Sequence, residues 1–525
     1  MQHWPVGRFA AVTPTRAPTR LQPSLPGFVF LILALLVPLF DGANMFNADG
    51  DTARHLRHGE TILQQGAVIR SDQFSFTYPG KEVVGFEYGS QVLLALSYRL
   101  GGTPGVASLT TLVVCTVLSM LLAWMIRRGA EPLLAVLTVL TAAILSSIHW
   151  IARPHVFSWP LMLLLFFWLE APRRPPVWAF GLLFMVWANL HGAFVFGWML
   201  LGFYFTGHLL ESRWSSSRST WQEERSAAWE LLPRMAMAVG ATVINPYGWK
   251  LPVHVLEFFR DPWIPRLTQE FQSPDFLREH RAFLIVLTGV LLILALRPRP
   301  RWTHFIVIAG TSGMALMMNR NIALFGLLAV PLVALLVRQP WSAALGGFGP
   351  LRRFEAASRR GATAPYVVLA ILALLGLAVI RGRIGGAQVV PDGFDRGVFP
   401  VNAVQWARGR ELQGRLFHEF EWGGYLLHAW PEQKIFIDGG TDFFTGAFMR
   451  AQGMVLSLQP GWRDSLAGWR VDRALLRSRA PLAAELLRSG TWRPLYCDET
   501  AILLERTQLD AESLPPSDCP SRGSD

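Results

Sequence analysis

The sequence predicts a polytopic α-helical membrane protein with about 11 transmembrane helices and a small extracytoplasmic α/β domain at its C-terminus. The 525 residues are 51% hydrophobic, and the mean hydropathy is +0.31. Only 16% of them are charged, whereas a soluble chain carries about 25%. The predicted parts are a basic cytoplasmic tail (1–26), a transmembrane domain (27–381) that includes an extracytoplasmic loop (41–102), and the α/β domain (382–525).

The N-terminal tail is rich in Pro, Thr and Arg and shows no apolar periodicity, which is typical of a flexible segment. The apolar run from Phe28 to Phe40 resembles the core of a signal peptide, but no convincing small-x-small cleavage site follows it. We therefore expect an uncleaved anchor that leads into the first loop.

Further apolar segments near the length of a bilayer crossing follow the first loop. Their expected limits are Thr103–Ile126, Pro132–Trp150, Val156–Glu170, Val177–Asn189, Ala193–Leu210, Ala228–Ile244, Ala282–Leu296, Trp302–Met317, Ile322–Val337 and Ala364–Ile380. Together with the anchor they give the predicted odd number of crossings.

Clusters of arginine set the predicted orientation. With the N-terminus inside, all the Arg-rich turns fall in the cytoplasm, as the positive-inside rule requires. These turns contain Arg127/Arg128, Arg173/Arg174, Arg213/Arg218/Arg225, Arg297/Arg299/Arg301 and Arg338/Arg352/Arg353/Arg359/Arg360. This distribution accounts for the net charge of +11 without a nucleic-acid partner. The predicted location is the inner (plasma) membrane, with the C-terminal domain outside.

Unusual polar residues gather in the turns on the opposite side. These turns are Asp49 to Glu87, His149 to His155, Trp187 to Gly192, Ile244 to Lys250 and Met318 to Asn321. A single buried His or Asn is ordinarily just a satisfied hydrogen-bonding group. Several such turns on one side favour a shared polar cavity that opens outward.

The first of these turns is dense in acids and imidazoles. It holds Asp49, Asp51, His55, His58, Glu60, Asp72 and Glu87. This density at a membrane exit indicates chemistry at the lipid–water boundary, against the alternative of a solvated loop that caps the helices below it. Asp49 and Asp51 can supply oxygen ligands to Mg or Mn, with His55 and His58 on one helix face. The alternative is a helix N-cap at Asp51 with surface imidazoles, so the metal stays unassigned.

Beyond Arg381 the chain becomes more charged, and strand-like and helix-like stretches alternate. Strands are expected at Arg415–Phe420, Lys434–Ile437, Val471–Leu476 and Ala501–Glu505, and helices in Trp422–Trp430 and Pro481–Ser489. Asp438 and Asp442 frame a Gly turn that is either a ligand site or only a turn. Cys497 and Cys519 either pair in an oxidising compartment or remain free thiols.

Four motifs carry a resemblance to a known class. They are D-x-D-T-x-x-H-L-x-x-G-E-x-I-L from Asp49, D-x-F-S-F-T from Asp72, F-x-E-F-E-W-G-G-Y-L from Phe417 and I-D-G-x-x-D from Ile437. With this architecture, the chain resembles the GT-C glycosyltransferases, which include protein O-mannosyltransferases, oligosaccharyltransferases and the aminoarabinose transferase of lipid A. More narrowly, it looks like a group of bacterial glycosyltransferase-like membrane proteins. Where that group usually has E-W-L, this chain has Glu87-Tyr88-Gly89, which leaves the role of that corner open.

The resemblance implies an inverting enzyme that moves a sugar from a polyprenyl-phosphate-linked donor to an envelope glycan, lipid or protein acceptor at the outer face. Such a reaction needs a base for the acceptor's proton and a positive environment for the departing phosphate. Asp49 or Asp51 is the expected base, and Arg153, Arg320 and Lys250 or His155 can hold the phosphate. The residues expected to bind substrate are His55, Asp72, Glu87, Arg153, His155, His191, Asn245, Tyr247 and Arg320.

Two other classes of function stay open at this point. One is a transporter or flippase of lipid-linked solutes, which would be expected to show related halves and broken helices near mid-bilayer. The other is a non-catalytic scaffold of envelope polysaccharide assembly. The sequence contains no P-loop, no G-x-S-x-G and no Cys/His metal spacing, which counts against ATP-driven transport and serine-type hydrolysis.

Overall fold

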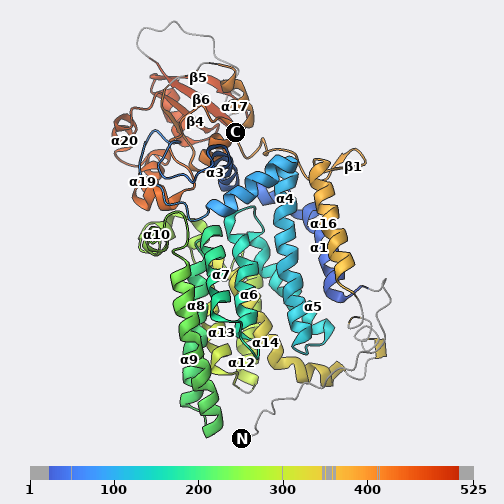
Figure 1. Ribbon diagram of the computed structural model, residues 1–525. Helices are drawn as coiled ribbons and strands as arrows, with labels where there is room; N and C mark the ends of the chain where they lie inside the picture. Colours follow the sequence, from blue (N-terminus) through green and yellow to red (C-terminus); the bar gives the residue numbers. More distant parts are fainter. Residues whose placement is uncertain are drawn as a thin grey trace.

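The computed structural model describes residues 23–507 apart from 49, 298, 346–348, 351–357, 359–361, 411 and 413. Long helices run up and down in one bundle, and the described part of the C-terminal segment (residues 382–507) sits on one end of it (Figure 1). We call this end of the bundle the capped end.

The bundle contains one helix for each apolar segment expected from the sequence. These helices are α1 (Leu25–Asp41), α4 (Tyr88–Arg127), α5 (Pro132–Ser146), α6 (Ser158–Leu169), α7 (Val177–Leu190), α8 (Phe194–Arg213), α9 (Arg218–Ala241), α12 (Arg281–Leu296), α13 (Trp302–Met317), α14 (Ile322–Leu345) and α16 (Ala364–Val379). Among the described residues, four helical stretches are long and apolar enough to cross a membrane: Tyr88–Arg127, Pro132–His149, Phe194–Arg213 and Asn319–Trp341. Several others are apolar but shorter. The chain is thus mostly helical with clear apolar spans, and about 11 crossings remain a prediction.

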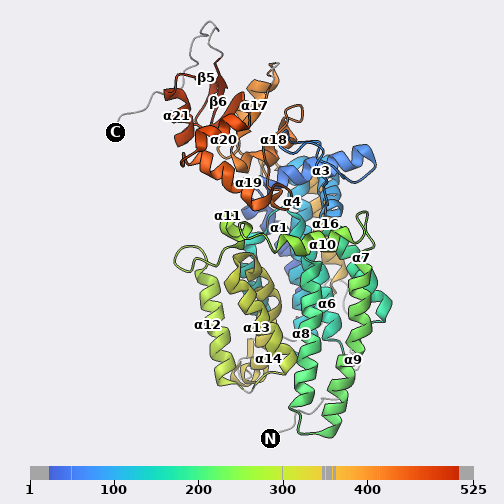
Figure 2. The same ribbon diagram turned by 90° about the vertical axis from the view of Figure 1, so that its left-hand side faces the viewer.

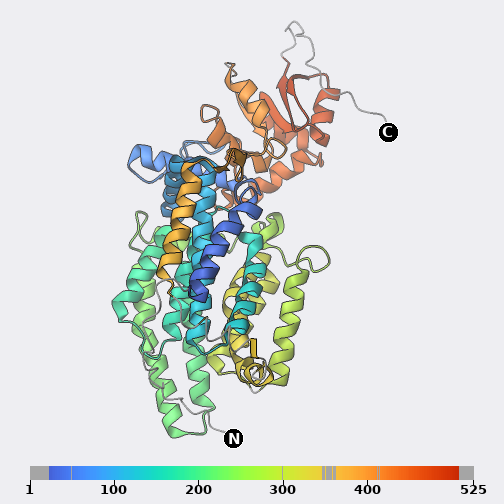
Figure 3. The same cartoon turned by 90° about the vertical axis from the view of Figure 1, so that its right-hand side faces the viewer.

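The helices pack in neighbouring groups. On one side, α1, α4 and α16 contact one another (Figure 3), and on the other side α8 packs between α9 and α13 (Figure 2). Large apolar side chains also cover the outside of the bundle, for example Ile285 (71% exposed) and Leu369 (53% exposed). An apolar outer surface of this kind suits contact with lipid rather than water.

A kink divides α4 and shapes the capped end. Gly101 and Gly102 have non-helical backbone angles, and Gly102 has a φ of +63°, which favours glycine. A Cβ at Gly101 would lie 2.6 Å from the Ala378 carbonyl oxygen, so α16 approaches closely there. The part of α4 before the kink therefore lies at the capped end, and the part after it descends through the bundle (Figure 1).

Short helices in the connections between the long helices lie at the capped end. They are α2 (Asn44–Asn47), α3 (Asp51–Gln65), η1 (Ser147–His149), η2 (Pro154–Phe157), α10 (Lys250–Phe258), α11 (Ile264–Leu267), η3 (Gln269–Phe271) and η4 (Asn319–Asn321). The helix α3 packs between the first part of α4 and α18 of the C-terminal segment. Connections that are far apart in the sequence thus meet at this end.

The C-terminal segment combines a four-stranded sheet with helices. Its elements are β1 (Arg383–Ile384), β2 (Ala387–Gln388), α17 (Val401–Arg408), β3 (Leu416–His418), η5 (Phe420–Trp422), α18 (Gly423–Ala429), α19 (Thr441–Leu456), α20 (Trp462–Gly468), β4 (Arg473–Arg477), α21 (Pro481–Arg488), β5 (Trp492–Cys497) and β6 (Ala501–Arg506). The strand order is β3-β4-β6-β5, with β3 parallel to β4 and the other pairs antiparallel. Phe417, Leu476 and Leu504 are fully buried in the core of this segment.

One strand expected from the sequence is wrong. Residues Lys434–Ile437 are outside the sheet, because their backbone partners come from the first loop: the Ile435 N–H donates to the Phe74 carbonyl, and the Phe76 N–H donates to the Ile435 carbonyl. The elements β5, α17, α19 and α20 were not expected from the sequence. Cys519 lies outside the described residues, so its pairing with Cys497 stays a prediction.

Candidate active site

The first loop and the C-terminal segment approach each other closely at glycines. A Cβ at Gly439 would lie 1.5 Å from Oδ1 of Asp51, and a Cβ at Gly424 would lie 2.2 Å from the Gly50 carbonyl oxygen. A Cβ at Gly50 would lie 2.0 Å from the Glu421 carbonyl oxygen. The glycines of D-G-D, W-G-G and D-G-G are therefore required by close approach, and these distant motifs form one structure.

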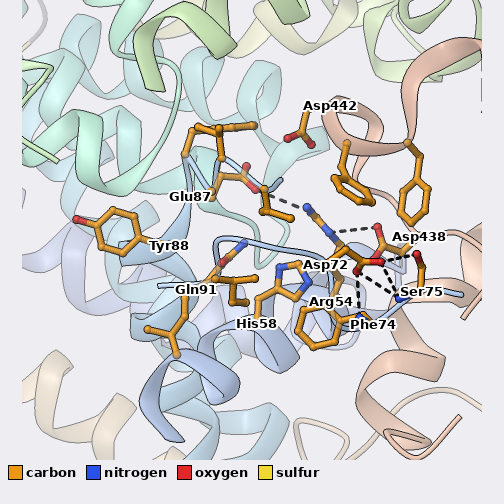
Figure 4. Close-up of a pocket in the computed structure, with 18 of the residues that line it drawn as sticks. Arg54, His58, Asp72, Phe74, Ser75, Glu87, Tyr88, Gln91, Asp438 and Asp442 are labelled. Atoms are coloured by element: carbon orange, nitrogen blue, oxygen red, sulfur yellow. Dashed lines mark hydrogen bonds and ion pairs between the residues drawn. The ribbon is translucent and has the colours of Figure 1, made fainter. Parts of the chain in front are cut away.

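Arg54 on α3 joins the two segments electrostatically. Its Nε lies 3.4 Å from Oδ1 of Asp438, and one terminal nitrogen lies 3.9 Å from Oε2 of Glu87 (Figure 4). All three side chains are largely buried, with exposed fractions of 6–14%. A buried guanidinium needs such carboxylate partners, so Arg54 helps to hold the C-terminal segment over α3.

Glu87, which directly precedes α4, lies among nitrogen groups at the centre of the site. Oε2 lies 3.8 Å from Nδ1 of His55, and Oε1 lies 3.7 Å from Nε2 of His191. Burial raises the pKa of Glu87 to about 7, although the charge of Arg54 opposes this shift. Burial also lowers the pKa of His55 and lowers that of His191 to about 3, so both imidazoles are neutral near pH 7.

A second cluster lies beside the first and pairs two guanidinium groups with two carboxylates. Arg153 contacts Asp51, and its other terminal nitrogen lies 3.2 Å from Oε2 of Glu270. Arg320 lies 3.9 Å from Oε1 of the same Glu270. Burial by itself would raise the pKa of Glu270, but the charges of Arg153 and Arg320 outweigh it and lower the pKa to about 2. We call Asp51, Arg153, Glu270 and Arg320 the arginine cluster.

A pocket opens between α3, the start of α4 and the C-terminal segment. Glu87 and Asp442 lie on its walls, with Arg54 between Glu87 and Asp438 (Figure 4). The rest of the wall is mainly apolar and aromatic, and includes Phe74, Phe86, Tyr88, Tyr247, Phe443 and Phe444. Apolar walls with a few converging polar groups are typical of sites for small ligands.

The structure brings together Asp51, His55, Glu87, Arg153, His191 and Arg320 of the residues predicted from the sequence. Asp72 lines the pocket, but its carboxylate accepts hydrogen bonds from Ser75 and from the Phe74 N–H and so closes a turn.

Three further residues that were expected to bind substrate make hydrogen bonds within the protein. Asn245 accepts a hydrogen bond from the Tyr247 N–H at 2.7 Å, and the Tyr247 hydroxyl donates to the Ile69 carbonyl at 2.8 Å. His155 donates from Nε2 to the His149 carbonyl at 2.9 Å. The bond from Tyr247 to Ile69 joins two connections at the capped end, and the other two contacts lie within one connection each.

The described residues do not form a metal site. Asp49 lies outside the described residues, and the rest contain no group of three or more His, Cys, Asp or Glu side chains placed to hold a metal ion. Asp51 faces the guanidinium of Arg153, which is a poor neighbour for a bound cation. Mg or Mn binding by Asp49 and Asp51 therefore stays unassigned.

Some site residues were missed by the sequence analysis. Arg54 and Glu270 were not singled out, and Asp438 and Asp442 were weighed mainly as turn formers. In the structure Asp442 accepts a hydrogen bond from Nε2 of His254 at 3.0 Å and so joins α10 to the C-terminal segment. The available signal for Glu270 was its place on the same predicted side as Arg153 and Arg320.

The fold resembles solved membrane glycosyltransferases. The archaeal oligosaccharyltransferase AglB from Archaeoglobus fulgidus, solved with an inhibitory peptide and a dolichol-phosphate, superposes with a TM-score of 0.54 at 13% identity over 86% of this chain and 69% of AglB. ArnT from Cupriavidus metallidurans bound to undecaprenyl phosphate gives a TM-score of 0.49 at 12% identity over 93% of this chain and 99% of ArnT. No family model and no curated protein sequence matches this chain. The chain has a GT-C-like membrane glycosyltransferase fold.

Proposed function

We propose that the protein is a membrane glycosyltransferase that moves a sugar from a polyprenyl-phosphate-linked donor to an acceptor in the cell envelope. The observation that carries the proposal is the arginine cluster, which sits at the capped end of an apolar helix bundle. A phosphate on a membrane-anchored lipid lies at the depth where such helices end. AglB, which shares the fold, was solved with a dolichol-phosphate, which supports the class of donor.

In the proposed complex, Arg153 and Arg320 bind the phosphate of the donor through charge-assisted hydrogen bonds. The carboxylate of Glu270 bridges these guanidinium groups in the structure, so the phosphate takes over contacts that Glu270 makes. As the bond between sugar and phosphate breaks, negative charge grows on the leaving oxygen. The two fixed positive groups stabilise that charge.

The proposal places the capped end outside the inner membrane and the N-terminus in the cytoplasm. The acceptor is an envelope glycan, lipid or protein whose hydroxyl or amide attacks the anomeric carbon with inversion. Asp49 and Asp51 remain the predicted bases from the sequence. Asp51 belongs to the arginine cluster and contacts Arg153.

The test removes one guanidinium and measures transfer in detergent, with no ion or voltage gradient. Purified protein receives a polyprenyl-phosphate-sugar mixture extracted from host membranes, and mass spectrometry detects free polyprenyl phosphate. We expect Arg153→Ala and Arg320→Ala to lose turnover by about 100-fold or more. The control Arg278→Ala, an exposed position at the same end, keeps it. Full turnover in both cluster variants, or no cleavage of the donor by the wild-type protein, would contradict the proposal.

A further inference from the structure

The carboxylates around the pocket differ in whether their oxygens already have a donor. Asp72 accepts hydrogen bonds from Ser75, Asp438 accepts one from the Gly440 N–H at 2.7 Å, and Asp442 accepts one from His254. Asp51 contacts Arg153 directly. Each of these four groups is engaged in holding the protein's own structure.

Glu87 is different. Within the described part of the chain, no hydrogen bond reaches its carboxylate, and the basic side-chain nitrogens paired with its oxygens are those of His191, His55 and Arg54, at 3.7, 3.8 and 3.9 Å. These separations exceed a hydrogen bond, whose donor–acceptor distance is about 2.7–3.2 Å. The Glu87 carboxylate is therefore buried without a close donor, which is costly unless an incoming group supplies one.

A ligand in the pocket can supply the hydrogen-bond donor that Glu87 lacks. Its side chain lines the pocket together with Asp438, Asp442 and several aromatic rings (Figure 4). An ionised carboxylate can only accept hydrogen bonds, so Glu87 selects a ligand that offers O–H or N–H groups. The aromatic walls suit the apolar face of a ring, and a carbohydrate presents both features.

We propose that the pocket holds a hydroxyl-bearing carbohydrate acceptor and that Glu87 takes the proton of the attacking hydroxyl. This inference rests on the proposed function and refines it, because it assigns the acceptor side of the site. It also replaces Asp49 and Asp51 as the base, and it leaves Asp51 to position Arg153.

The reaction balances with these groups alone. The acceptor hydroxyl gives its proton to the Glu87 carboxylate, and the oxygen forms a bond to the anomeric carbon. The bond from that carbon to the phosphate oxygen breaks, and its electron pair leaves on the polyprenyl phosphate. Arg153 and Arg320 hold that anion, while the protonated Glu87 later loses its proton to solvent.

The electrostatic surroundings of Glu87 agree with this role. Arg54 and His55 face it from α3, His191 from the turn after α7 and Asp442 from the C-terminal segment, and Arg320 and Glu270 act from farther away. Burial raises the pKa of Glu87 to about 7, since the neighbouring imidazoles are neutral and only Arg54 is a close cation. A base with a pKa near the working pH is the most effective one.

The experiment compares Glu87→Gln and Glu87→Asp with Glu82→Gln, which changes an exposed glutamate of the same loop. The full-length protein is assayed for transfer from the host polyprenyl-phosphate-sugar mixture across the pH range. We expect Glu87→Gln to lower kcat by about 100-fold or more while the KM for donor stays unchanged. Wild type and Asp51→Asn both show a rate that rises with pH through about 7, and Glu87→Asp keeps a weak rate with this rise.

Two failures can be told apart. A wild-type protein that never cleaves the donor sinks the proposed function, whatever Glu87 does. An active wild type with an unchanged kcat in Glu87→Gln, or with a rate independent of pH around 7, sinks the role of Glu87 alone. If Glu87→Gln does not fold, the wild-type profile and Glu87→Asp decide. A flat wild-type profile, or a full rate in Glu87→Asp with the pH rise displaced well below 7, contradicts a base held in this geometry.

Discussion

Gly439 offers a sharp test of how the site is built, because an added methyl group there would meet a functional carboxylate. In Gly439→Ala the new Cβ would lie 1.5 Å from Oδ1 and 2.5 Å from Cγ of Asp51. Real Cβ atoms keep at least 3.0 Å from their neighbours, so about 1.5 Å of movement is required. The strain is steric and local, since Gly439 does not have a positive φ.

Either way of relieving the clash disturbs the site. If Asp51 moves, it leaves Arg153, and if the C-terminal segment moves, Asp438 leaves Arg54. A misplacement of about 1 Å at a catalytic site costs on the order of 100-fold in rate. We therefore expect Gly439→Ala to lower kcat for donor cleavage by about 100-fold.

The matched control is Gly453→Ala in α19, where nothing lies within 4 Å of the added Cβ. Alanine is favoured over glycine inside a helix by up to about 1 kcal/mol, so this variant keeps its activity and gains slight stability. The assay measures donor cleavage by mass spectrometry and thermal unfolding on the same preparations. Wild-type turnover in Gly439→Ala would refute the close approach of Asp51 to the C-terminal segment.

Three further predictions test other parts of the account. Glu270→Gln removes the carboxylate that bridges Arg153 and Arg320, so a short-chain prenyl phosphate should bind roughly tenfold more tightly. Weaker binding would contradict competition between Glu270 and the phosphate for these two arginines. Burial by itself would lower the pKa of His254, but the hydrogen bond to Asp442 outweighs burial and raises this pKa above 6.5. The stabilisation that the pair gives to the folded state is complete below pH 6.5 and is lost as the pH rises through the raised pKa. Limited proteolysis at the contact between α10 and the C-terminal segment should therefore become faster with rising pH in wild type. It should be fast at all pH values in Asp442→Asn, and Asp464→Asn should behave like wild type. In a cysteine-depleted background, Glu82→Cys should react with a membrane-impermeant thiol reagent added outside and Arg297→Cys should not, and the reverse pattern would overturn the proposed orientation.

The helix bundle was predictable because a run of apolar residues near bilayer length has few other stable structures. The convergence of Arg153, His191 and Arg320 with the first loop also followed from the sequence, since alternate turns of an up-and-down bundle share one end. Such reasoning places a residue at an end of the bundle. It does not give the residue's partners.

The partners depend on contacts between distant segments, which one sequence does not reveal. Arg54 reads as one more charge on α3 until the structure places Asp438 beside it. In the sequence, Lys434–Ile437 resembles a sheet strand because it is a short and mostly apolar run. In the structure these apolar side chains are buried, but Ile435 pairs with Phe74 and Phe76 of the first loop. Glu87 was expected to bind substrate, but its lack of a close donor is visible only from the positions of His55 and His191.

The proposed reaction is cleavage of a polyprenyl-phosphate-linked sugar at the arginine cluster. The most direct measurement mixes purified wild-type protein, in detergent and without any gradient, with the lipid-linked sugars of the host and follows free polyprenyl phosphate by mass spectrometry. We expect release by wild type and by Arg278→Ala, and loss of release in Arg153→Ala. Intact donor in every sample, or equal release by all of the variants, would contradict it.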